Sequence, residues 1–128
     1  MTRELGYDRK MHSQAVLEHF RNPRNAGKLA NSNAEVLATN PICGDVLELA
    51  ARAEAGKIAE ARFLCRGCTT SIACASYLTE SLTGCNLEQA RAITPEEISE
   101  ALGGLPPATF HGAQLAVDAL RLLLAKLD

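Results

Sequence analysis

The residues of this chain with the greatest capacity for chemistry stand in three short stretches. Cys43 and Asp45 flank a glycine, Cys68 follows Gly67, and His111 lies beyond a proline-rich turn. Thiolate, carboxylate and imidazole all bind metals, and a thiolate is also a nucleophile. Gathered at one point, these side chains would form a metal site. The elements that carry them decide whether they meet.

The stretch around Cys68 predicts a change from strand to helix. Residues 62–82 predict a strand that breaks at Gly67 and delivers Cys68 to the first turn of a helix. A thiol there faces backbone N–H groups without helical partners and the positive end of the helix dipole. Both favour the thiolate, which is the form that binds metal. The apolar stripe expected on this helix consists of Ser71, Ile72, Ala75, Leu78 and Leu82.

A β-hairpin is expected just before this helix. Alternating apolar residues predict a strand over 45–53 and a returning strand over 58–65, joined by a tight turn. An antiparallel hairpin places the residues before its first strand beside those after its second strand. Cys43 and Cys68 are therefore expected to meet through sheet geometry alone. A weaker strand is expected at 33–39.

A helix is expected near the N-terminus. Apolar spacing predicts it over residues 8–20, and either Asp8 or Ser13 is a suitable cap. The asparagine–proline pair that follows ends it, because proline disfavours helix in the residue before it. His12 and His19 lie in or beside this helix, and packing or surface roles are favoured for both over metal ligation.

Three further helices follow the central one. Two short helices with capping boxes are expected after Asn86 and Thr94. The last helix, over residues 111–127, has an apolar face too wide for a simple surface helix, so it lies across the sheet or meets a partner. This order predicts an α+β fold with a small antiparallel three-stranded sheet packed against several helices on one face. Residues 1–128 are expected to form a single domain.

Composition excludes several classes of protein. The 128 residues carry a formal charge of −2, which argues against nucleic acid as a partner. Aromatic residues make up only 4% of the chain, so few platforms exist for stacking bases. No apolar run reaches the length of a membrane span, and the N-terminus lacks the apolar segment of a signal peptide. A cytoplasmic protein without a membrane partner is expected.

The five cysteines are odd in number and irregularly spaced, which favours free or metal-bound thiols over a disulfide framework. Cys65 and Cys68 have the two-residue gap of a zinc knuckle, but no second pair completes four ligands. From the spacing alone, two small apolar residues at a strand end are favoured over a metal site, and Asp45 could simply be a turn or strand-initiating residue. Cys74 and Cys85 are expected to be small buried hydrophobic residues.

Several motifs resemble those of the U-type iron–sulfur cluster assembly scaffolds, the family that also forms the N-terminal domain of the nitrogenase-maturation scaffold NifU. They follow the family order over nearly the whole length: Glu18 to Gly27, Cys43-Gly44-Asp45, Ala61-Arg62-Phe63, Gly67-Cys68, Ser71-Ile72-Ala73, and Leu105-Pro106-Pro107 ahead of His111. The resemblance implies a scaffold that transiently binds a [2Fe–2S] cluster and passes it to apo-proteins. It implies no enzymatic turnover.

The resemblance also implies the site residues and one departure from the family pattern. The ligands that it implies are Cys43, Asp45, Cys68 and His111. The family's third cysteine directly follows the histidine, and here that position is Gly112. Cys65 could supply a substitute thiolate. The remaining two sulfurs, one nitrogen and one oxygen suit a [2Fe–2S] cluster with two non-cysteine ligands, or Zn²⁺ in its place.

The partners implied by the resemblance are a cysteine desulfurase, an iron donor and apo-acceptor proteins, and a homo-oligomer stays open. The family segment that docks an Hsp70-type chaperone is Leu-Pro-Pro-Val-Lys. Here residues 105–109 end in Ala108-Thr109, so the lysine cation is missing and chaperone docking is doubtful.

Two other functions stay open. One is a zinc-binding sulfur-relay protein that accepts persulfide sulfur from a cysteine desulfurase. The other is a regulatory relative that assembles no cluster. A hydrolase that uses Cys68 and His111 is least favoured, because no oxyanion-hole motif is present.

Overall fold

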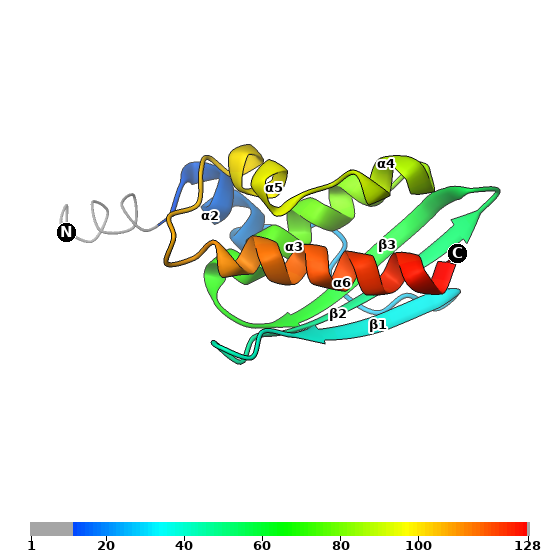
Figure 1. Ribbon diagram of the computed structural model, residues 1–128, viewed down its shortest axis with the longest axis horizontal. Coiled ribbons are helices and arrows are strands. Elements are labelled where there is room, and N and C mark those ends of the chain that lie inside the picture. Colours follow the sequence, from blue (N-terminus) through cyan, green and yellow to red (C-terminus); the bar gives the residue numbers. More distant parts are fainter. Residues whose placement is uncertain (1–11, 128) are drawn as a thin grey trace.

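The computed structural model describes residues 12–127, and the structural statements below concern that range. A three-stranded antiparallel sheet in the order β1-β2-β3 carries its helices on one face (Figure 1). The elements are α2 (Gln14–Arg21), β1 (Ala34–Thr39), β2 (Val46–Glu54), β3 (Lys57–Arg66), α3 (Thr69–Leu82), α4 (Leu87–Arg91), α5 (Pro95–Ala101) and α6 (His111–Leu127). The predicted α+β fold is confirmed.

The β2–β3 hairpin forms as the sequence predicts. Its turn consists of Ala55 and Gly56, whose φ angles are 54° and 78°. Positive φ at both central residues is the type I′ geometry, which matches the twist of the flanking strands. The register pairs Val46 with Arg66, so the residues before β2 lie beside those after β3. The hairpin therefore positions the loop before β2 next to the start of α3.

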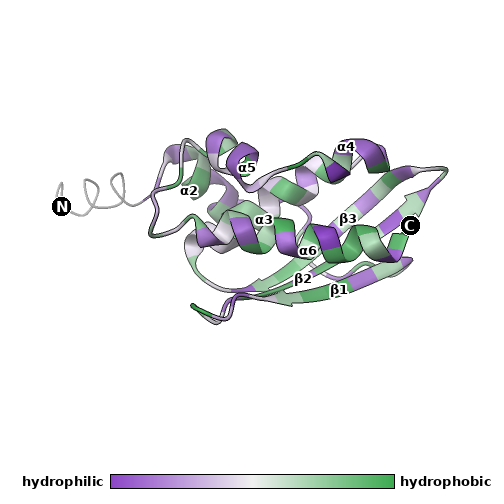
Figure 2. Cartoon of the chain, viewed as in Figure 1, coloured by the Kyte–Doolittle hydropathy of each residue, from purple (hydrophilic) through white to green (hydrophobic). Residues whose placement is uncertain are grey.

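Helices α3 and α6 cover the sheet. Helix α3 packs against β3, and α6 packs against β1 and β2. Figure 2 shows hydrophobic residues along the sheet and α6, and mostly hydrophilic residues on α5. The wide apolar face of α6 thus lies across the sheet, which was one of the two alternatives for it.

The narrow stripe predicted for α3 is wrong. The buried residues of this helix occupy most of its circumference: Thr70, Ser71, Ala73, Cys74, Ala75, Ser76, Leu78, Thr79 and Leu82. The cause is that α3 is enclosed by three elements, because it contacts α2 and α6 as well as β3. Small residues such as alanine and serine allow these neighbours to approach closely.

Helix α2 begins at Gln14, so residues 12 and 13 of the predicted helix are not helical, and its residues 8–11, Asp8 included, lie outside the described residues. Ser13 is its N-cap, because its side chain accepts a hydrogen bond from the backbone N–H of Val16 at 3.0 Å. His19 is buried, as expected for a packing residue, with its Nδ1 2.8 Å from the hydroxyl of Ser76.

Burial and the neighbouring Arg24 lower the pKa of His19, although Glu80 and Glu18 act in the opposite direction. The same hydroxyl of Ser76 accepts a hydrogen bond from the backbone N–H of Arg24. A neutral His19 therefore links α2 to α3 inside the protein.

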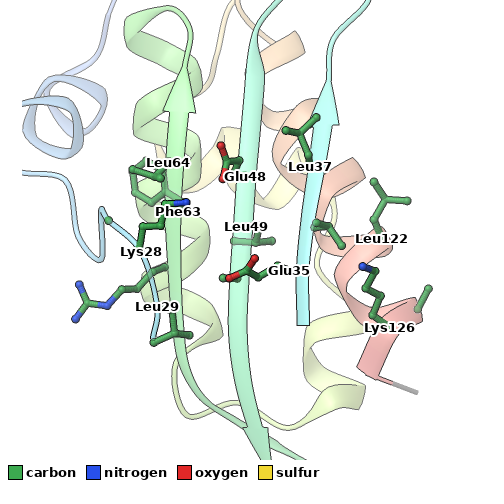
Figure 3. A pocket seen from close by; sticks show the side chains of 15 residues that line it. Lys28, Leu29, Glu35, Leu37, Glu48, Leu49, Phe63, Leu64, Leu122 and Lys126 are labelled. Atoms are coloured by element: carbon green, nitrogen blue, oxygen red, sulfur yellow. The ribbon is translucent and has the colours of Figure 1, made fainter. Parts of the chain in front are cut away.

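The opposite face of the sheet carries a groove of about 600 Å³, lined by apolar and charged side chains (Figure 3). Leu37, Glu48 and Leu64 lie directly across from one another on β1, β2 and β3 within it. None of the four predicted site residues lines this groove. Among the helices of residues 12–127, none has the length and apolar character to cross a bilayer.

Candidate metal centre

Three elements begin at the same edge of the molecule, at the left-hand end of the sheet in Figure 1. Strand β2 follows Asp45, α3 follows Cys68, and α6 starts with His111. Ligand atoms of Cys43, Asp45 and His111 all lie within 4.8 Å of one another. The sulfur of Cys68 lies 3.8 Å from Nε2 of His111. The fold thus brings all four residues that the sequence singled out to one edge, where three form a close group and Cys68 adjoins it through His111.

The loop between β1 and β2 presents Cys43 through a turn organised by Asn40. The side-chain oxygen of Asn40 accepts hydrogen bonds from the backbone N–H groups of Ile42 and Cys43, at 2.9 and 3.2 Å. Its carbonyl accepts from the N–H of Gly44, a residue with a φ of 79°. Asparagine favours such turns because its side chain imitates a backbone acceptor. The thiol of Cys43 is left exposed to solvent.

Asp45 is the buried member of the group, with a relative exposure of 9%. Its Oδ2 accepts a hydrogen bond from the hydroxyl of Ser71 at 2.6 Å and one from the backbone N–H of Cys68 at 3.4 Å. Burial alone would raise the pKa of Asp45, but hydrogen bonds from Ser71, Cys68 and Cys43 together lower it below its usual value. An ionised carboxylate is therefore available at neutral pH.

Gly67 provides the space that Asp45 occupies. A Cβ atom on this glycine would lie 2.8 Å from Cγ of Asp45, which is closer than side chains approach one another. The φ angle of Gly67 is not positive, so any residue could adopt its backbone conformation. The lack of space for a side chain explains why a glycine stands here. The sequence indicated only that Gly67 ends the strand.

Cys68 is the N-cap of α3, directly before the first helical turn in which the sequence placed it. Its backbone is extended, with φ −76° and ψ 169°, and its sulfur accepts a hydrogen bond from the N–H of Ser71 at 3.4 Å. Oδ2 of Asp45 lies 3.8 Å from Nε2 of His111, at the first residue of α6. Two helix N-termini thus point toward the candidate site, and their partial positive charge favours anionic groups.

Cys65 is half-buried and packs against the core. Burial raises the pKa of its thiol to about 12, and the negative charges of Asp45, Cys68 and Cys43 act in the same direction. The thiol is therefore the neutral form in the metal-free protein. Its role as a substitute ligand stays a prediction.

Gly112 is buried at the contact between the first turns of α6 and α3. An added Cβ would lie 3.2 Å from both N and Cα of Ser71. The position at which the family has its third cysteine is thus tightly packed against α3, next to the residue that binds both Asp45 and Cys68.

All five cysteines are free thiols. Cys74 is fully buried in the core, as predicted. Cys85 is only half-buried, so the prediction of a buried residue is too strong for it. It follows the C-terminal turn of α3, where one side remains open to solvent.

Ser71 is the residue of this site that the sequence analysis missed. Its position on the predicted apolar stripe of α3 indicates packing and no contact with Asp45. A hydroxyl three residues after an N-cap was the only available signal, because that position turns back toward the cap. The contact with Asp45 joins residues 26 positions apart in the chain, so no local sequence pattern predicts it.

Two solved structures share this fold. The N-terminal part of a nitrogen-fixing NifU-like protein from Brucella abortus has a TM-score of 0.75 and 16% identity, covering 94% of this chain and 96% of its own. A putative iron–sulfur cluster assembly scaffold of the SUF system from Fervidobacterium islandicum also has a TM-score of 0.75. Its identity is 19%, and the match covers 90% of this chain and 97% of that one. At these identities the likeness concerns the fold alone.

Similarity of sequence extends to named proteins. The iron–sulfur cluster assembly scaffold protein IscU 1 of Archaeoglobus fulgidus is 40% identical over 111 residues, covering 87% of this chain and 72% of that protein. IscU of Escherichia coli is 38% identical over 118 residues, covering 89% and 91%. The nitrogen fixation protein NifU of Cereibacter sphaeroides is 49% identical over 110 residues, or 86% of this chain and 45% of that protein. Residues 11–127 match the family described as the NifU-like N terminal domain, and the chain belongs to this family.

Proposed function

We propose that this chain is an iron–sulfur cluster assembly scaffold, with residues 1–128 acting as one scaffold domain. Relatives that are named as such scaffolds support this function, and one of them matches over most of both chains. In this proposal a [2Fe–2S] cluster is cargo, built on the protein transiently and then passed to apo-proteins. The protein supplies coordination and release and performs no turnover.

The observation that carries the proposal is the convergence of two thiols, a carboxylate and an imidazole at one edge of the fold. We assign Cys43 and Cys68 as the soft thiolate ligands, which bind iron strongly. His111 would contribute a neutral nitrogen, and mixed cysteine and histidine ligation of such clusters is chemically sound. Asp45 would be the one hard oxygen ligand, which holds the cluster less tightly and favours its release.

The partners in this proposal follow from the cargo. A cysteine desulfurase supplies sulfur, an iron donor supplies iron, and apo-proteins accept the product. Chaperone docking at residues 105–109 is doubtful for the reason given by the sequence, and a homo-oligomer stays open. The cytoplasmic location likewise stays a prediction.

Anaerobic reconstitution tests the proposed function. The protein would be incubated with ferrous iron, sulfide and thiol, then desalted and examined by absorption spectroscopy and metal analysis. We expect the visible absorption of an iron–sulfur cluster, with iron and sulfide in equal amounts, and transfer to an apo-ferredoxin. Stoichiometric zinc with no iron uptake would contradict the proposal.

A second candidate is a zinc-binding sulfur relay. The observation that favours it is Gly112, because the site offers two sulfurs, one nitrogen and one oxygen, a set that suits tetrahedral zinc. Here a thiol of Cys43 or Cys68 would accept persulfide sulfur from a cysteine desulfurase. Tightly bound zinc together with labelled sulfur on one of these residues would select this function. Failure to accept sulfur at all would select the regulatory relative.

A further inference from the structure

Ser71 links two proposed ligands that come from different parts of the chain. Its hydroxyl donates to Oδ2 of Asp45 at 2.6 Å, and its backbone N–H donates to the sulfur of Cys68 at 3.4 Å. The hydroxyl oxygen itself lies 3.4 Å from that sulfur. Ser71 is 2% exposed, so water does not replace these contacts easily.

The carboxylate of Asp45 is held between two neighbours. On one side Gly67 leaves it no spare room, because even a Cβ there would lie 2.9 Å from Oδ2. On the other side Ser71 supplies the shortest hydrogen bond that the carboxylate receives from the described residues. An aspartate side chain has two rotatable bonds, so such contacts decide which way its oxygens point.

Ser71 is itself fixed by backbone packing. It lies in the first turn of α3, and Gly112 of α6 approaches so closely that a Cβ there would meet N and Cα of Ser71 at 3.2 Å. The serine hydroxyl thus stands at a place set by the contact of two helices. A group held in this way can orient a ligand before any metal arrives.

We infer that Ser71 is the positioning residue for Asp45 in the metal centre, an inference that rests on the proposed function. Its hydroxyl fixes the carboxylate toward Cys43 and His111, and it touches no metal itself. Outer-shell partners of this kind typically change metal affinity about 10- to 100-fold when they are removed. Without the hydroxyl of Ser71 the chain should still fold, but the carboxylate of Asp45 would no longer be held in its orientation.

The test measures Co²⁺ binding by competition with a coloured chelator, under anaerobic conditions. We expect Ser71→Ala to weaken Co²⁺ binding about 10- to 100-fold in the otherwise unchanged chain. In the Asp45→Ala background the same substitution should change the affinity by less than about twofold, because the carboxylate is gone and only the longer 3.4 Å contact of the hydroxyl with the sulfur of Cys68 remains. Ser81→Ala, which removes a hydroxyl further along the same helix, is the matched control and should have no effect.

The visible spectrum of bound Co²⁺ gives a second readout, because its bands depend on the geometry of the ligands. Ser71→Ala should alter these bands, whereas Ser81→Ala should leave them as they are. Equal losses of affinity with and without Asp45 would overturn the inference and assign Ser71 a structural role. Unchanged binding in Ser71→Ala, with good binding by the parent chain, would overturn it too. No Co²⁺ binding by the parent chain would instead overturn the proposed function, and the inference with it.

Discussion

Replacing Gly67 with alanine tests whether Asp45 needs the space beside it. The added Cβ would lie 2.8 Å from Cγ of Asp45, whereas ordinary contacts begin near 3.4 Å. The carboxylate must therefore move by about 0.6 Å, the difference between these distances. The backbone accepts alanine, because the φ of Gly67 lies outside the positive region. The side chain of Asp45, and not the main chain, is the group that gives way.

The cost of this movement divides unequally between folding and metal binding. The displaced carboxylate loses or stretches its 2.6 Å bond to Ser71, and a hydrogen bond to a charged group contributes about 1.5–3 kcal/mol. Asp45 regains part of this by turning toward water, so we expect the free energy of unfolding to fall by less than about 1.5 kcal/mol. The proposed ligand loses its place, so Co²⁺ affinity should fall about 10- to 100-fold.

The assay combines a Co²⁺ competition titration with urea unfolding of the metal-free protein from the same preparation. Gly67→Ala in the Asp45→Ala background is the control, because the added methyl group then meets no carboxylate. There we expect little further loss of affinity. An affinity for Gly67→Ala within about twofold of the parent chain would refute the reasoning, since it would mean that the position of Asp45 does not matter to the metal.

Asp45→Ala should make a cluster reconstituted with added thiol persist longer and slow its transfer to an apo-ferredoxin, because a soft thiolate can then occupy the position that the hard carboxylate has left. Because Asp45 is buried and hydrogen-bonded to Ser71, the free energy of unfolding should fall as well. Faster loss of the cluster would contradict the prediction and make Asp45 a required ligand. Gly112→Cys should lengthen the cluster lifetime followed by absorbance. An unchanged lifetime would mean that the new thiol, tightly packed against α3, does not reach the site. Ala55→Asn should raise the free energy of unfolding by about 1 kcal/mol, since Ala55 has a φ of 54° and asparagine tolerates that region better. A lower stability in urea would contradict the turn assignment. The folded-state pKa of His19 is lowered, so the unfolded chain takes up its proton first and stability should fall as the pH drops below about 6.5. His19→Gln should remove this part of the pH dependence, and equal slopes for both chains would show that another group causes it.

Local signals carried most of the fold prediction. The type I′ turn between β2 and β3 and the capping boxes at Asn86 and Thr94 depend on residues next to one another in the chain. Such features are visible in sequence because the interaction lies within the pattern itself. The hairpin register, which pairs Val46 with Arg66, then brought the loop that carries Cys43 to the edge of the sheet where Cys68 begins α3.

Contacts between segments that lie far apart in the chain could not be predicted from the sequence. The edge of β3 is closed by a short segment: Gly27 donates its N–H to the carbonyl of Phe63 at 2.8 Å, and Phe63 donates to Asn25 at 3.0 Å. A pairing of only a few residues is too short to show a periodic pattern in the sequence. The bond of Ser71 to Asp45 and the burial of α3 on nearly all sides depend on packing among several elements, which a single helix pattern does not encode.

In the proposed site, a glycine at position 112 in place of a cysteine would change the charge of the centre as well as its number of ligands. A third thiolate would add one negative charge at the N-termini of α3 and α6, whose dipoles offset anionic ligands. Without it, a cluster held by two thiolates, Asp45 and a neutral His111 is one unit less negative than a cluster bound by three thiolates and an aspartate. Nitrogen ligation in place of sulfur raises the reduction potential of a [2Fe–2S] cluster, and lower negative charge acts in the same direction. A cluster on this scaffold should therefore be easier to reduce than one on a three-cysteine relative. Because Gly112 also allows the close approach of α6 to Ser71, the same position would link the charge of the proposed centre to the orientation of Asp45, its one proposed oxygen ligand.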